Sequence, residues 1–330
     1  MSRISRYQES IEKYFKSKSS INNFDDVTKN FVLNACENTD YFLAIILLTT
    51  FKSQSKKTNA SAHCYHIAAA MENIYLFMKE SENYDNLPST YSTKHTDYST
   101  IKLVILNNIH HNIALNLENI CLEYTKDKTL KLNTLINKII SSKLLSAMLN
   151  SNDFVKYVPT LDYKKYDMLD YKFKNKKHKQ KLSSMKFYSC DMTMQMVKDS
   201  TCTLCQLIIH ISWLLGGGEN SASIDTQINA VGYHLGIIMK IAYDFHNIDN
   251  DLEIAKKSSR NVVINLGIQE SFELFDMHKQ KYIEKSMILE IHTNTIKEII
   301  DILAARIDNF IDNTETIKNQ LNSSNNSETT

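Results

Sequence analysis

Glycine and proline are scarce in this sequence. Its 330 residues include 6 glycines and 2 prolines, against roughly 23 and 16 at average usage. Turn-rich β-sandwiches and α/β folds with glycine-rich loops need both residues, so their scarcity argues against these classes. Long helices need neither residue in quantity. The sequence therefore favours an all-α protein.

The sequence also lacks a charge imbalance and long apolar runs. The net charge is +1, so no overall field points to nucleic acid or to an anionic membrane. No apolar run reaches the roughly 18 residues that spanning a bilayer requires. The two most apolar stretches, 41–51 and 204–215, contain polar residues and are predicted to be buried helices. Residues 1–6 are charged and lack the apolar region of a signal peptide, so a cytoplasmic location is expected.

The six cysteines are dispersed, as expected for reduced thiols in a cytosol-like compartment. Cys202 and Cys205 have the C-x-x-C spacing, but no second Cys/His pair lies nearby in the sequence. The spacing therefore indicates two small buried side chains one helical turn apart rather than a zinc site.

Helical periodicity runs through nearly the whole chain. A triplet, 216–218, holds half of the glycines and is predicted to end a helix. Residues 83–95 contain Pro88 among Asn, Ser and Thr and are predicted to be a loop. The predicted helices cover 24–50, 60–78, 96–124, 130–149, 185–215, 223–252, 261–266, 270–288 and 292–319.

One large domain is expected. Residues 1–23 would be an N-terminal extension, 24–320 a single helical domain, and the Ser/Asn/Thr-rich 321–330 a disordered tail. An irregular basic insertion at 150–184 interrupts the domain, with lysines and aromatics interleaved up to residue 181. It could be a contact surface for phosphate or nucleic acid, or a solvated insertion between helices. The net charge near zero favours the solvated insertion.

A helix with two glycines and one aspartate carries the strongest signal. Gly232 and Gly236 have the spacing G-x-x-L-G and are followed by an apolar run and Asp244. This stretch resembles the second aspartate-rich helix of the trans-isoprenyl diphosphate synthases. Residues 261–267 resemble the T-L-P-hydrophobic-A-L-G segment of that family, and 68–75 resemble the helix leading into its first aspartate motif. The resemblance spans roughly residues 25 to 310 in the right order.

The resemblance implies a fold and a chemistry. The fold would be an isoprenoid-synthase-type bundle of about ten or more helices around a central cavity, and the protein would be a homodimer as the family is. The family condenses isopentenyl diphosphate with an allylic diphosphate. Expelling a triply negative diphosphate needs a cluster of Mg²⁺ ions, which two carboxylate clusters on facing helices hold.

Both carboxylate clusters are degraded here. The first reads E-N-Y-D-N from Glu82 and the second Y-D-F-H-N from Tyr243. The candidate metal ligands that remain are Glu82, Asp85, Asp244, Asn247 and Asp251. The last three share one helix face at i, i+3 and i+7, so with the first two they could bind one or two Mg²⁺ ions. The alternative is a solvated face or helix end, and Mg²⁺ binding is doubtful.

The phosphate-binding cations are also reduced. The arginine pair expected after the first cluster is absent, and Ser200 stands where the resemblance implies a lysine. The remaining candidates for binding substrate diphosphate are Lys52, Lys56, Lys57 and Lys257. Phe77 and Met78 lie just before the first cluster and would either floor a tunnel for short products or pack in the core.

Three functions fit these residues. The lost carboxylates and cations favour a catalytically degenerate relative, acting as a regulatory or scaffolding subunit in a homodimer or in a heteromer with an active synthase. The alternative is an active prenyltransferase that uses a divergent Mg²⁺ site and isoprenyl diphosphate substrates. The third is an unrelated all-α interaction protein with 172–181 as its binding patch. No nucleic acid partner is expected.

Overall fold

The all-α prediction is confirmed. The structure is a computed structural model that describes residues 2–18, 26, 29, 39–55, 62–82, 134, 157–162, 176–255 and 257–325. In these ranges the chain is helical apart from connections and one isolated antiparallel bridge between Leu161 and Phe187. Within the same ranges, no helix is both long enough and apolar enough to cross a membrane.

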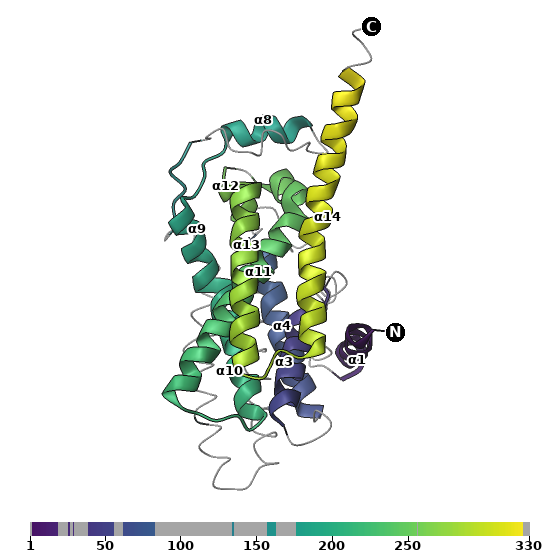
Figure 1. The fold of residues 1–330 in the computed structure, drawn as a ribbon, viewed down its shortest axis with the longest axis vertical. Helices are drawn as coiled ribbons and strands as arrows, with labels where there is room; N and C mark the ends of the chain where they lie inside the picture. Colours follow the sequence, from purple (N-terminus) through teal and green to yellow (C-terminus); the bar gives the residue numbers. More distant parts are fainter. Residues whose placement is uncertain are drawn as a thin grey trace.

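The helices form an elongated bundle in which α11 and α10 lie at the centre (Figure 1). A π-helical turn at Lys198–Cys202 joins α9 to α10. The helices are α1 (Arg3–Lys18), α3 (Phe42–Gln54), α4 (Ala62–Glu82), α8 (Lys176–Ser184), α9 (Cys190–Val197), α10 (Thr203–Leu215), α11 (Ala222–Ile254), α12 (Val262–Leu266), α13 (Ile268–Ile288) and α14 (Asn294–Asn325).

Two glycines set how closely α10 and α11 approach. A Cβ atom added to Gly232 would lie 2.4 Å from Cα of Gln206, and one added to Gly236 would lie 2.4 Å from Cα of Cys202. Any larger residue would push the two backbones apart. The glycine pair is therefore required by the packing of these helices against each other.

The most apolar stretches are buried helices, as predicted. Every residue from Phe42 to Phe51 in α3 is buried, and α3 packs against α10 and α4. In α10 the buried run includes both faces of the helix from Leu207 to Leu215. A helix that is apolar all round is expected only where neighbours cover it on every side.

Several helix boundaries differ from the prediction. The helix expected from 185 begins at Cys190, because the Ser189 side chain accepts a hydrogen bond from the Met192 backbone N–H and caps it. Helix α14 runs to Asn325, five residues into the segment 321–330 that was expected to be a tail. The expected helices 96–124 and 130–149 and the loop 83–95 lie outside the described residues, except for residue 134.

Helices α1 and α8 both pack against the bundle. In α1, Ile4, Ile11 and Phe15 are buried in the main hydrophobic core, so residues 3–15 are part of the folded domain rather than an appendage. In α8, the Lys181 ammonium donates a hydrogen bond to the backbone carbonyl of Glu253 at 2.8 Å. That carbonyl lies in the last turn of α11, where a cation complements the helix dipole.

Candidate functional site

Asp244 is the aspartate that the sequence resemblance assigns to a second aspartate motif, and its side chain is held by protein groups. It is fully buried. Its Oδ1 atom lies 3.0 Å from Nζ of Lys240, one helical turn earlier on α11. Its Oδ2 atom accepts a hydrogen bond of 2.6 Å from the backbone N–H of Val262, the first residue of α12. The carboxylate therefore neutralises a buried lysine and caps a helix.

Asn261 connects the rest of this cluster. Its Nδ2 group donates to the backbone carbonyl of Asp244 and to Oδ2 of Asp251, both at 2.8 Å. Its Oδ1 atom accepts from the backbone N–H of Ile264 and so caps α12. One buried asparagine thus ties Asp244 and Asp251 of α11 to the start of α12.

A second lysine reaches the same helix from α4. The Lys79 ammonium lies 3.9 Å from the centre of the Tyr243 ring and 5.3 Å from that of Tyr75. Tyr243 stands at the leading position of the second aspartate motif. The contact therefore places a protein cation against the position where the resemblance implies a metal-binding carboxylate.

The candidate ligands on α11 are already engaged by protein groups. Mg²⁺ needs oxygen ligands in near-octahedral geometry. Asp244 pairs with Lys240 and accepts a hydrogen bond from the first residue of α12, and Asp251 accepts a hydrogen bond from Asn261. The Asn247 Nδ2 group donates to the backbone carbonyl of Tyr243. Among the described residues, no group of three or more His, Cys, Asp or Glu side chains is arranged to hold a metal ion.

The other predicted site residues are dispersed. Met78 is buried in the core, and Lys257 is exposed after α11. Glu82 ends α4, but its side chain lies outside what the structure describes, as does that of Phe77. Asp85, Lys56 and Lys57 also lie outside the described residues.

Lys52 lies at the end of the bundle away from Asp244. It is in the last turn of α3, next to the end of α10, since a Cβ on Gly216 would lie 2.6 Å from Cβ of Gln54. Helix α11 begins six residues after Gly216, at Ala222. Asp244 follows 22 residues further on, about 33 Å at 1.5 Å per residue. The structure therefore does not bring Lys52 to the Asp244 cluster.

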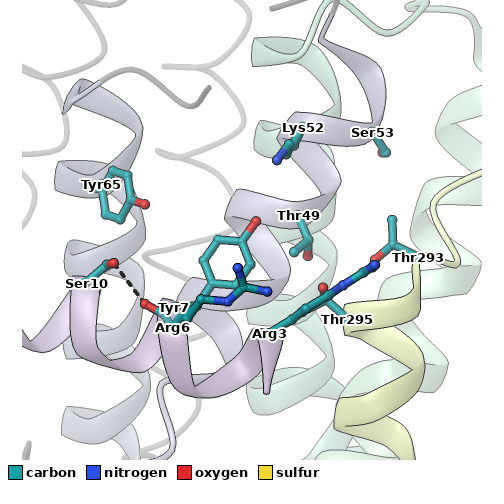
Figure 2. Close-up of a pocket in the computed structure, with 10 residues that line it drawn as sticks. All are labelled: Arg3, Arg6, Tyr7, Ser10, Thr49, Lys52, Ser53, Tyr65, Thr293 and Thr295. Atoms are coloured by element: carbon teal, nitrogen blue, oxygen red, sulfur yellow. Dashed lines mark hydrogen bonds between the residues drawn. The ribbon is translucent and has the colours of Figure 1, made fainter. Parts of the chain in front are cut away.

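A pocket of about 580 Å³ surrounds Lys52 (Figure 2). It is formed by α1, the end of α3, the start of α4 and the start of α14. Its charged lining residues are Arg3, Arg6 and Lys52, and every other lining residue carries a hydroxyl group. This pocket is separate from the aspartate-motif region.

Three residues around Asp244 were not predicted from the sequence. Lys240 lies i−4 from Asp244, a spacing that predicts an ion pair on a helix. Asn261 precedes a short apolar helix and has the residue type of an N-cap. Lys79 gave no signal, because only tertiary packing brings it to Tyr243.

The fold is that of the trans-isoprenyl diphosphate synthases. A geranyltransferase from Legionella pneumophila superposes with a TM-score of 0.57 at 12% identity, covering 93% of this chain and 96% of that one. A geranyltranstransferase from Thermotoga maritima gives 0.53 at 15% identity, covering 92% and 97%. A geranyl diphosphate synthase small subunit from Antirrhinum majus gives 0.50 at 11% identity, covering 92% and 100%.

The likeness is one of structure. No protein-family model matches the sequence, and no curated protein matches it. The structural matches nevertheless extend over nine-tenths of this chain. The expectation of an all-α, isoprenoid-synthase-type fold is therefore confirmed.

Proposed function

We propose that this protein is a catalytically degenerate relative of the isoprenyl diphosphate synthases that acts as a regulatory or scaffolding subunit. The observation that carries the proposal is the buried ion pair between Lys240 and Asp244. It commits the one remaining aspartate of the second motif to a protein cation.

Charge explains why this arrangement is unsuited to diphosphate expulsion. A site for several Mg²⁺ ions needs an excess of carboxylates. Along α11, Asp244 is neutralised by Lys240, and Lys79 lies on Tyr243 at the leading motif position. Two ammonium groups therefore lie at or next to the motif positions, where they lower the negative charge available to a metal ion. The remaining candidate ligands, Glu82 and Asp85, would have to hold the metal alone.

A subunit role needs the fold but not the metal cluster. Over 92% of its length the chain matches the fold of a synthase small subunit. We infer that its partner is an isoprenoid-synthase-type chain, either a second copy or an active synthase. The fold matches that of the isoprenyl diphosphate synthases. No observation therefore favours the alternative of an unrelated all-α interaction protein.

The test is incorporation of radiolabelled isopentenyl diphosphate into longer prenyl diphosphates, with Mg²⁺ and each of several allylic diphosphates. The unmodified protein alone should give none. Mixed with an active isoprenyl diphosphate synthase of the same organism, it should co-elute on gel filtration and change the rate or the chain length of the product.

An Asp244→Asn variant separates true activity from contamination. Incorporation by the unmodified protein that is lost in this variant, while the variant keeps the circular dichroism spectrum of the parent at the assay temperature, would contradict the proposal, because it would show that Asp244 serves catalysis. Incorporation that persists equally in the variant identifies a copurifying synthase. Failure to associate with either a second copy or an active synthase would refute the subunit role.

A further inference from the structure

Three cations gather at the pocket between α1, α3 and α14, and within the described part of the chain no carboxylate pairs with them. Arg3, Arg6 and Lys52 line it, and no acidic residue does. None of the three is within ion-pair distance of an Asp or Glu among the residues that the structure describes. Like charges brought together repel one another. Binding an anion here would relieve that repulsion and is therefore electrostatically favourable.

Some hydroxyl groups of the pocket already donate to the backbone, and those of two tyrosines supply further donors. The Ser10 hydroxyl donates to the backbone carbonyl of Arg6, and those of Ser53 and Thr49 donate to carbonyls of α3. The hydroxyls of Tyr7 and Tyr65 have no such bond within the described residues. Both tyrosines are half-buried, and burial raises the pKa of each phenol. They therefore remain protonated and able to donate at neutral pH.

The start of α14 closes the third side. Figure 2 shows Arg3 extending toward Thr293 and Thr295. The Thr293 hydroxyl accepts the backbone N–H of Ile296 at 3.3 Å, and Thr295, in the first turn, is 5% exposed. The N-terminus of this 32-residue helix adds partial positive charge to the side of the pocket that Arg3 reaches.

We propose that this pocket binds a small molecule bearing a phosphate or diphosphate group, without a metal ion. Guanidinium groups match phosphate oxygens with paired N–H donors, and the two tyrosines and Thr295 add neutral donors. A pocket of about 580 Å³ also has room for an organic group beside the phosphates, since ligand pockets commonly run from about 300 to 1,000 Å³. The site is distinct from the Asp244 region, which lies toward the other end of α11.

The experiment is calorimetric titration of the full chain with inorganic pyrophosphate in EDTA at low ionic strength. EDTA removes any contribution from a divalent cation at the aspartate motifs, so the result is independent of the catalytic question. Binding is expected for the unmodified protein, and weaker binding as NaCl is raised because salt screens exposed charges. The Arg3→Gln/Arg6→Gln variant should lose roughly tenfold or more in affinity, as hydrogen bonds to charged groups are lost.

Two further variants make the result specific. Lys52→Gln should weaken binding, whereas Lys281→Gln, which removes an exposed cation from α13, should leave it unchanged. Because all four cations are exposed, each variant should keep the melting temperature of the parent. No pyrophosphate binding, or an equal loss in Lys281→Gln, would overturn the proposal. Binding to vesicles containing phosphatidic acid but not to pyrophosphate would also overturn it, by identifying a membrane surface instead of a small-molecule site.

Discussion

Lys240 and Asp244 lie one turn apart on α11 and form an ion pair of 3.0 Å whose two side chains are at most 8% exposed. The pair occupies the position where the isoprenyl diphosphate synthase motif would place a metal-binding carboxylate. Because the same carboxylate caps α12, we expect its removal to lower the free energy of unfolding.

Asp244→Ala should lower the free energy of unfolding by about 3–5 kcal/mol, because it leaves a buried ammonium without its partner. The backbone N–H of Val262 loses its acceptor at the same time. Urea denaturation monitored by circular dichroism measures the change. Lys240→Met combined with Asp244→Asn should be more stable than Asp244→Asn alone, because the double variant leaves no buried charge.

Glu253→Ala is the matched control, because Glu253 is exposed on the same helix. Its effect should be within about 0.5 kcal/mol. If Asp244→Ala costs no more than this control, Asp244 is not the structural carboxylate that its contacts describe.

Restoring the lost carboxylates should not restore metal binding while Lys79 is present. The restored variant returns Asn83, Asn86, Tyr243 and Asn247 to Asp. The Lys79 ammonium, now 3.9 Å from the Tyr243 ring centre, would pair with the new carboxylate there and compete with Mg²⁺. Adding Lys79→Ala should make magnesium-dependent diphosphate binding detectable by calorimetry, with little turnover because the phosphate-binding cations are still missing.

Lys281→Ala added to the same restored variant is the control for general charge removal. Equal Mg²⁺ binding with and without Lys79→Ala would show that Lys79 does not occupy the site. If none of these variants binds, the alignment of the two motifs with the synthase clusters is wrong.

Acidification should destabilise the protein through two histidines. The Nδ1 atoms of His234 and His278 are 2.8 Å apart. Burial, with His234 and Lys281 nearby, lowers the pKa of His278 to about 4, and burial also lowers that of His234. The unfolded chain takes up protons near pH 6.5 while the folded chain does not. Stability is therefore lost as pH falls from about 6.5 toward 4.

His278→Gln should reduce this pH dependence, which melting temperatures between pH 7 and pH 5 would measure. Met277→Gln, at an exposed position of α13, should leave the slope as in the parent. Identical slopes for the parent and His278→Gln would rule out the His234–His278 contact as the cause.

Gly236→Ala should destabilise the contact between α10 and α11. The added Cβ would lie 2.4 Å from Cα and 2.7 Å from N of Cys202, and both are backbone atoms that a side-chain rotation cannot move. Overpacking of this kind costs about 1–3 kcal/mol, measurable as a lower urea midpoint. Ser223→Ala, exposed on the same helix, should have no comparable effect, and an unchanged midpoint for Gly236→Ala would contradict the close approach.

The aspartate-motif region shows which features could be predicted from the sequence and which could not. The G-x-x-L-G spacing and the aspartate after it identified α11 and the fold. The i, i+3, i+7 spacing correctly placed Asp244, Asn247 and Asp251 on one helix, but it could not show what their side chains contact. Asn261 lies 17 positions after Asp244. It donates hydrogen bonds to Asp251 and to the backbone of Asp244 only because α12 folds back onto α11.

The sequence by itself determined that this protein is a helical bundle. Scarce glycine and proline and a 3.6-residue apolar period act locally, residue by residue, so they can be read without the fold. The tertiary structure decided what the charged residues do. A buried carboxylate must find a cation or a donor, and whether that partner is Mg²⁺, Lys240 or the N-terminus of α12 depends on which backbone closes around it. In the same way, Arg3, Arg6 and Lys52 become one site only where α1, α3 and α14 meet.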